Sequence, residues 1–213
     1  MKELNFPLFV LLTAFRMSPA SEGNYIDATK LVVSHNKRIA NHKTFASIAK
    51  RGKTSTGWFF GFKLHAVINH FGQLVVLTVT AGNVADNNVD LLEKLTSHLK
   101  GFLLADAGYI TSLKVNLQQR GLSLITKLRA NSKPQPLNPE QKYYLNHRGL
   151  IETVFDCLKN RCNMDHSRHR SVKNFFINLW AGLLAYTFMD RFPTIPTYVP
   201  KMQPITNPEI VLI

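Results

Sequence analysis

Cysteine is nearly absent from this chain, since only Cys157 and Cys162 occur. A disulfide framework is indicated by an even number of cysteines distributed along the chain, and two neighbouring thiols do not form such a set. They also lack the paired spacing of a structural zinc site. We therefore expect reduced, structural thiols and a reducing cytoplasm as the compartment.

Long apolar runs are missing as well. The run FFINLWAGLLAYTFM, within Asn174–Arg191, is shorter than the ~20 residues that span a bilayer, and Asn178 interrupts it. A buried core helix and no membrane association are expected. The first residues imitate a secretory signal, but Glu3 and Pro7 argue against export. An exported or membrane protein is the alternative, which cleavage near Ala20 would reveal.

Acidic side chains are scarce: 13 Asp and Glu face 26 Lys and Arg, which gives a net charge of +13 and a pI near 9.9. Such an excess predicts a polyanionic partner, because neutralising phosphates releases counterions. We expect this partner to be nucleic acid. A basic protein that merely stays soluble is the alternative.

Gly-rich phosphate loops and internal repeats are also absent, and 213 residues with 45% hydrophobic composition predict one medium-sized domain. Strands are predicted at 23–33, 58–69, 73–82, 101–110 and 123–129. Helices are predicted at 83–100, 112–121, 144–163 and 173–191, with polar loops at 34–57 and 130–142. This order, β-β-β-α-β-α-β-α-α, predicts an α/β mixed sheet with helices packed on it.

Three carboxylates occupy positions where burial of an ionised group would be unfavourable. Asp27 and Asp106 interrupt apolar runs that are typical of core strands, and Glu152 lies on the predicted helix 144–163. An ionised carboxylate in a dry site costs several kcal/mol unless it is paired or metal-bound. Asp106 alone could cap a turn, but it also ends an apolar strand, where α/β sheets place ligand sites. Together the three indicate a site that holds divalent metal against phosphate.

The predicted helix 144–163 has two stripes. Its core stripe consists of Ile151, Val154, Phe155 and Leu158. The adjacent stripe consists of Arg148, Glu152, Asp156 and Lys159. One carboxylate is therefore expected between two cations at the edge of the core. A solvated, salt-bridged face explains the same stripe when it is considered alone.

Several segments resemble the catalytic domain of bacterial insertion-sequence transposases of the DDE superfamily, most closely the nine-eight-two family of insertion sequences. These segments are YIDAT, HKTFASIAKRGKTSTGWFFGFKLH, TAGNVAD, LLADAGYI, LITKLR, RGLIETVFDCLKN and HSRHRS. The resemblance implies a ribonuclease-H-like fold in which Asp27, Asp106 and Glu152 are the catalytic, metal-binding triad. It also places the superfamily's Arg-x3-Glu-x6-Lys pattern on Arg148, Glu152 and Lys159.

This resemblance further implies two Mg²⁺ ions, with Mn²⁺ as a substitute, and no small-molecule cofactor. The implied partners are DNA, as transposon ends and target, and a second copy of the chain, because two DNA ends must be brought together. The chain departs from the pattern in two places. Position 145, where a tyrosine is common, is Leu145, with Tyr144 one place earlier. Only residues 1–26 precede the first aspartate, where similar transposases carry a helical DNA-binding region.

Three parts of the chain are therefore expected. Residues 1–21 are an apolar helical lead-in and the remnant of a preceding region. Residues 22–192 are the ribonuclease-H-like catalytic domain. Residues 193–213 are a tail that contains prolines.

Basic residues outside the triad are candidates for DNA contact. They are Arg148, Lys159, Lys37, Arg38, Lys43, Lys50, Arg51, Lys53, Lys63, His65, Arg168 and Arg170. A soluble basic surface is the alternative for the runs, and His65 fits a core position equally well. The aromatic run Trp58, Phe59 and Phe60 could stack on an unpaired base, although core packing is favoured.

Two rival functions fit the same residues. A different ribonuclease-H-like nuclease would hydrolyse DNA without joining a cut end to a target. A truncated, inactive transposase remnant would bind DNA without specificity or form inactive mixed oligomers. Inverted terminal repeats in the neighbouring DNA would favour a transposase.

Overall fold

The computed structural model describes residues 4–127, 136–165 and 169–200. A six-stranded mixed sheet forms its centre. The strands are β1 (Gly23–Ser34), β2 (Lys50–Thr54), β3 (Gly57–Asn69), β4 (Leu74–Ala81), β5 (Gly101–Ala105) and β6 (Leu122–Thr126). Their order is β2-β3-β1-β5-β6, and β4 also pairs with β3. Strand β1 is antiparallel to β3 and parallel to β5, so it lies where the two kinds of pairing meet.

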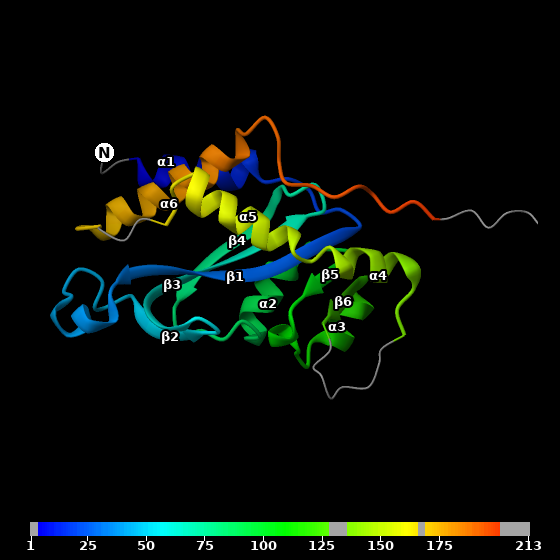
Figure 1. Cartoon of the computed structure of the whole chain (residues 1–213), viewed down its shortest axis with the longest axis horizontal. Coiled ribbons are helices and arrows are strands. Elements are labelled where there is room, and N and C mark those ends of the chain that lie inside the picture. Colours follow the sequence, from blue (N-terminus) through cyan, green and yellow to red (C-terminus); the bar gives the residue numbers. More distant parts are fainter. Residues whose placement is uncertain (1–3, 128–135, 166–168, 201–213) are drawn as a thin grey trace, which may run out of the picture.

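Helices cover both faces of this sheet (Figure 1). The first group contains α1 (Asn5–Val10) with its π-helical continuation η1 (Leu11–Arg16), α5 (Leu150–Asp156) with its continuation η4 (Cys157–Arg161), and α6 (Val172–Thr187). The second group contains α2 (Val89–Thr96) and α3 (Lys114–Gln119), and α4 (Pro139–Asn146) packs near β5 and β6. This mixed α/β architecture is consistent with a ribonuclease-H-like fold, as predicted.

Each face of the sheet has its own hydrophobic core. Tyr25 and Leu64 lie in the core formed with α5 and α6, whereas Ile26 and Val67 lie in the core formed with α2 and α3. Side chains alternate between faces along a strand, so both faces of the central strands are buried. The position of a residue in this alternation therefore decides which group of helices it meets.

The predicted hairpin of β3 and β4 is confirmed. The two strands pair antiparallel, and the turn between them contains Gly72 with a φ of 73°. Glycine populates this left-handed region without the strain of a Cβ. Tyr186 of α6 donates a hydrogen bond of 2.7 Å to the carbonyl of Gly72, which anchors the turn to the helix layer.

The polar loop predicted at 34–57 is wrong in part, because it contains a strand. Strand β2 pairs with the first residues of β3, and a 3-10 helix, η2 (Asn36–Asn41), precedes it. The sequence KRGKT of β2 carries no apolar alternation, so its pairing with β3 rather than burial makes it a strand. The helix predicted at 83–100 is also shorter, since α2 begins after its N-cap Asn88.

The helix predicted at 144–163 is instead two helices. α4 begins inside the predicted loop, where Asn138 and Gln141 form a capping box and Pro139 occupies the first turn. These residue types at this spacing are a start signal that the sequence contains and that the prediction overlooked. α5 begins after Gly149, so Arg148 precedes the helix that carries Glu152.

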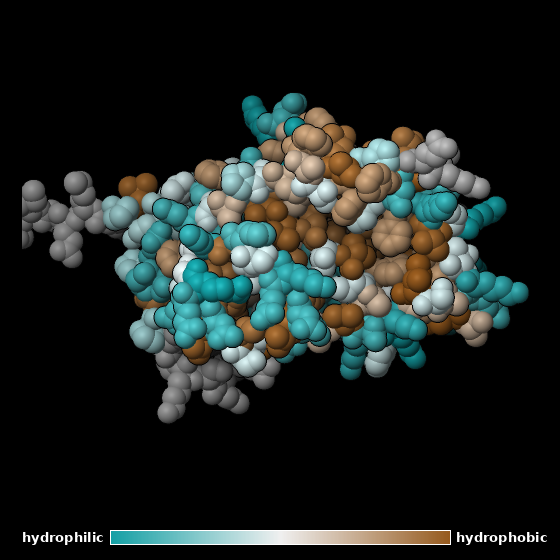
Figure 2. Space-filling view, turned by 180° about the vertical axis from the view of Figure 1, so that it is seen from behind, coloured by the Kyte–Doolittle hydropathy of each residue, from teal (hydrophilic) through white to brown (hydrophobic). Residues whose placement is uncertain are grey.

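The predicted core helix near residue 180 is confirmed as α6. Trp180 donates a hydrogen bond of 2.9 Å from Nε1 to Asn5 Oδ1, which joins α6 to α1. Figure 2 shows apolar side chains gathered around a hollow on the face seen from behind. This hollow of about 390 Å³ is lined by residues of α1, η1, β3, β4 and α6. Within the described ranges, no helix is long and apolar enough to cross a membrane.

Candidate active site

Asp27 and Asp106 lie at the same level of two adjacent parallel strands. In the pairing of β1 with β5, Asn24 is opposite Leu103 and Tyr25 is opposite Leu104. Asp27 and Asp106 each follow two residues later, so the register brings them side by side at the ends of the paired segments. Tyr25 and Leu104 both belong to the core with α5, and alternation turns the two aspartates toward the same face.

The pKa of Asp27 is shifted by burial and by neighbouring groups. Burial raises this pKa to about 6, although the Ala28 N–H, which donates a hydrogen bond of 2.8 Å to Asp27 Oδ1, lowers it. Arg148 also lowers the pKa, whereas the carboxylates of Asp86 and Asp106 raise it. These charges act on Asp27 because they share one site with it.

Glu152 enters the site region from α5 together with Arg148. The Arg148 guanidinium is buried and donates a hydrogen bond of 2.7 Å from Nη2 to Glu152 Oε1. Its Nε finds no hydrogen-bond partner in the described part of the chain. The side chain of Glu152 is 59% exposed. Lys159, the last residue of the Arg-Glu-Lys pattern, lies 3.7 Å from Asp165 Oδ2.

The register places Asp27 beside Asp106, and the charge of Asp106 raises the pKa of Asp27. Among residues 4–127, 136–165 and 169–200, no three His, Cys, Asp or Glu side chains form a group ready to hold one metal ion. Glu152 accepts the hydrogen bond from Arg148 through Oε1, and a carboxylate has a second oxygen with which it can bind metal without release of this ion pair. The convergence of all three carboxylates stays a prediction.

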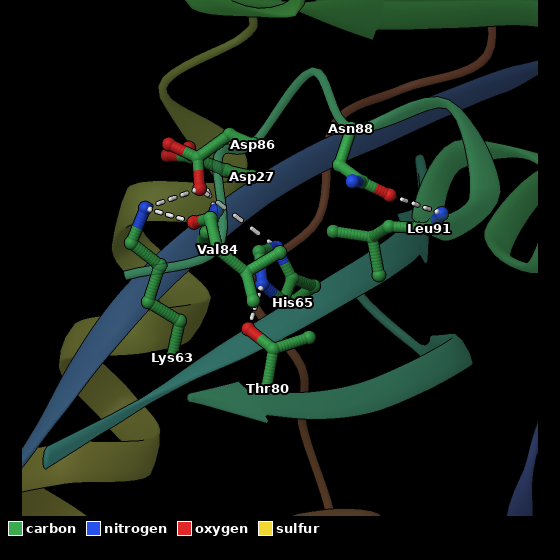
Figure 3. Close-up of polar contacts among 9 residues, drawn as sticks. Asp27, Lys63, His65, Thr80, Val84, Asp86, Asn88 and Leu91 are labelled. Atoms are coloured by element: carbon green, nitrogen blue, oxygen red, sulfur yellow. Dashed lines mark hydrogen bonds and ion pairs between the residues drawn. The ribbon is translucent and has the colours of Figure 1, made fainter. Parts of the chain in front are cut away.

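Asp86 is a fourth carboxylate of the site that the sequence reasoning missed. It follows β4 and accepts a hydrogen bond of 2.8 Å from Lys63 Nζ, which also donates to the Val84 carbonyl at 3.0 Å. The Asp86 and Asp27 carboxylates overlap in the view of Figure 3, and the charge of Asp86 raises the pKa of Asp27. Asp86 was recognisable as the first acidic residue after Asp27 in the sequence.

His65 completes this network below Asp86 (Figure 3). Its Nε2 shares a hydrogen bond of 2.9 Å with Thr80 Oγ1, and its Nδ1 lies 3.9 Å from Asp86 Oδ1. Burial lowers the pKa of His65 to about 4, so the imidazole is neutral at pH 7. Lys63 and His65 were predicted to contact DNA; both are buried in this network, and DNA contact by either of them stays a prediction.

Replacing Asp86 with Asn should destabilise the fold by about 1–3 kcal/mol, because the buried Lys63 ammonium then loses its charged acceptor. Urea unfolding at pH 7 measures this change. Lys63→Met should cost a similar amount, and the double variant should cost less than the two single changes together. Lys94→Met, at an exposed lysine of α2, is the matched control and should stay within about 0.5 kcal/mol of the unchanged protein. Strictly additive losses would contradict the pairing.

Tyr109 places a buried hydroxyl among the same carboxylates. Its side chain lies in the core with α2 and α3, and its Oη has no hydrogen-bond partner among the described residues. Burial raises the pKa of Tyr109, and Asp27, Asp86 and Asp106 raise it further. The hydroxyl therefore stays protonated.

The raised pKa of Asp27 predicts an unusual dependence of stability on pH. In the unfolded chain this carboxyl has its ordinary pKa of 3.8, whereas in the folded protein the value is about 6. Between these values the folded state binds more protons, so the free energy of unfolding falls as pH rises through about 4 to 6. The difference between the folded and the unfolded pKa of Asp27 corresponds to roughly 3 kcal/mol in the free energy of unfolding.

The difference between the unchanged protein and Asp27→Asn isolates this effect. In metal-free buffer, Asp27→Asn should be the more stable of the two above pH ~6 and should lose its advantage toward pH ~4. Urea unfolding at several pH values measures the difference. If Asp27→Asn and the unchanged protein are equally stable at pH 4 and also equally stable at pH 7, the pKa of Asp27 is not raised by folding.

Most of the predicted DNA contacts lie on the surface around β2. Exposed side chains there are Lys37, Arg38, Lys43, Lys50, Arg51 and Lys53, and Arg170 is exposed near the start of α6. Arg168 falls outside the described residues. Core packing, favoured for the aromatic run, is confirmed for Phe59 and Phe60 but is wrong for Trp58, which is 52% exposed.

The family model of the transposase DDE domain matches residues 18–172, which include β1, β5, α5 and all three predicted triad positions. The chain belongs to this family. DDE transposases are phosphoryl-transfer enzymes that act in DNA transposition, and they generally use divalent metals. Membership thus implies a catalytic role in transposition and DNA binding for the fold described above. No curated protein matches the chain.

Proposed function

We propose that this chain is the catalytic domain of an insertion-sequence transposase, which cleaves DNA and joins the cut end to a target. The main support for the proposal is that Asp27 and Asp106 occupy equivalent positions on two adjacent parallel strands, within the region that the family model matches. Glu152, on the helix that packs against β1, is the third acid of the proposed catalytic triad. Residues 22–192 are the proposed catalytic unit, and the nine-eight-two family of insertion sequences is the proposed subgroup.

The donor set fits divalent metal. Carboxylate oxygens are the hard ligands that Mg²⁺ prefers, with Mn²⁺ as a chemical substitute. Burial, and to a smaller extent two neighbouring acids, raises the pKa of the Asp27 carboxyl, and a bound cation would favour its ionised form. Asp27, Asp106 and Glu152 would hold the ions. Two bound ions would supply activation of the attacking oxygen and neutralisation of the leaving oxygen.

The residues of the chain itself orient the reacting groups. Arg148 holds Glu152 through one nitrogen, and its unpartnered Nε supports a second role as a phosphate donor. Lys159, on the same helical segment, would add a point charge toward the DNA backbone. Lys63 forms an ion pair of 2.8 Å with Asp86 and thereby ties the loop after β4 to β3.

Strand transfer is the test of this proposal. The protein is incubated with Mg²⁺, a target plasmid and labelled duplexes copied from the DNA that borders its own gene. A transposase joins the labelled 3′ end to the plasmid, and we expect this joined product. Hydrolysis without joining would instead support a plain ribonuclease-H-like nuclease. Sedimentation of the protein with and without the duplexes tests the proposed homodimer on DNA.

A further inference from the structure

The hairpin of β2 and β3 carries an exposed tryptophan beside two cations. Trp58 is 52% exposed, although the next residue, Phe59, is buried. The guanidinium carbon of Arg51 lies 4.7 Å from the centroid of the indole, and Lys53 Nζ lies 5.7 Å from it. Both distances are within the range of cation–π attraction. The indole is therefore held in place by positive charge over its ring, while about half of the residue stays exposed.

Strand pairing puts this surface on the face of the sheet that carries the catalytic aspartates. Lys53 is opposite Trp58 in the antiparallel pair, so the two side chains lie on one face. Alternation along β3 puts Ala66 on the same face as Trp58, and Ala66 is opposite Asp27. Eight residues of β3 separate Trp58 from Ala66, which corresponds to roughly 26 Å.

The surroundings of Trp58 are strongly positive. The sequence between Asp27 and Asp86 contains no acidic residue. The exposed basic side chains near the hairpin include Lys37, Arg38, Lys43 and Lys50. Asn36 of η2 donates a hydrogen bond of 2.7 Å to the Trp58 carbonyl, which joins the basic 3-10 turn to the hairpin. Such a surface suits a polyanion whose repeating units also present flat aromatic groups.

We propose that Trp58, with Arg51 and Lys53, is a stacking site for an unpaired base of the DNA that the enzyme engages, which rests on the proposed function. Bases inside a duplex are already stacked on their neighbours, whereas an unpaired base has a free face for the indole. Arg51 and Lys53 would bind the phosphates on either side of that base. A strand within a duplex advances about 3.4 Å per nucleotide, so about eight nucleotides of such a strand, or fewer of a more extended single strand, span the distance to Asp27.

Fluorescence of Trp58 tests the contact directly, because Trp58 and Trp180 are the only tryptophans. The variant Trp180→Phe leaves Trp58 as the sole reporter. One probe is a duplex with a single-stranded tail of ten thymines, and the other is the same duplex with blunt ends. Quenching by the tailed probe and little change with the blunt one are expected. An equal response to both probes would overturn the proposal.

Affinity provides the second measurement. Trp58→Ala should weaken binding of the tailed duplex by about 5- to 100-fold and change binding of the blunt duplex by less than about twofold. Trp58→Phe should retain most of the preference for the tail, because a flat ring remains. The matched control is Phe71→Ala, at an aromatic residue that is 45% exposed in the turn between β3 and β4, and it should leave both affinities unchanged. Circular dichroism melting verifies that each variant folds.

Three results would overturn the stacking site. One is an equal loss of affinity for both probes in Trp58→Ala, and another is no loss at all. The third is quenching of Trp58 by polyglutamate as strong as that by the tailed DNA, which would indicate an acidic polymer site. Salt-sensitive binding of blunt duplex without any preference for the tail would remove this site and leave the proposed function standing. If the protein binds neither the tailed nor the blunt duplex, both the stacking site and the proposed function are contradicted.

Discussion

Asp27→Asn is expected to lower metal-dependent DNA cleavage by about 10³-fold or more, while folding and duplex binding persist. The amide keeps the size of the carboxyl group but removes the negative charge that a divalent cation requires. Loss of several kcal/mol of stabilisation in the transition state corresponds to this factor. Asp106→Asn and Glu152→Gln should show the same loss. The measurement is the initial rate of cleavage of a labelled duplex with Mg²⁺ and with Mn²⁺.

A matched control for these variants lies on the same helix as Glu152. Asp156 is exposed and accepts a hydrogen bond of 2.6 Å from Asn160, so it is an acid of α5 with a local partner. Asp156→Asn should retain at least half of the activity. An Asp106→Asn protein that cleaves DNA at the normal rate would end the assignment of the triad. A normal rate for Glu152→Gln alone would instead mean that its pairing with Arg148 is its main role.

Raising the salt concentration from ~50 to ~200 mM should weaken duplex binding by about 10³-fold, because contacts to roughly six phosphates release their counterions. The exposed basic residues around η2 and β2 are numerous enough to provide such contacts. The slope of log affinity against log salt counts the contacts. Arg38→Ala and Lys43→Ala should each reduce this slope by about one and weaken binding to all sequences alike.

Lys94 provides the control for the salt measurement. It is an exposed lysine of α2 that lies in one surface hollow with Asp90 and Glu93, so nearby acids offset its charge. Lys94→Ala should leave the slope unchanged. If the slope of the unchanged protein is flat, phosphate contacts do not dominate its binding, and the basic surface has another role.

Much of the fold could be predicted from local patterns. The apolar strand around Asp27, the hairpin closed at Gly72 and the core helix α6 all followed from periodicity and turn chemistry, which depend on near neighbours in the sequence. The prediction failed at β2, whose polar sequence becomes a strand only because β3 offers an edge to pair with. It also failed at α4, where the capping signal around Asn138 was present but overlooked.

The aspartates at 27 and 106 were recognisable in the sequence because charge inside an apolar run is costly wherever that run is buried. Their shared level and shared face could not be derived from the sequence, because the register between β1 and β5 is set by strands that lie far apart in it. The contribution of Asp86 likewise depends on a loop that folds back beside Asp27. Residue types thus identified the chemistry of this protein. The pairing of distant strands decided which side chains meet, since burial and electrostatic coupling arise only when the chain has folded.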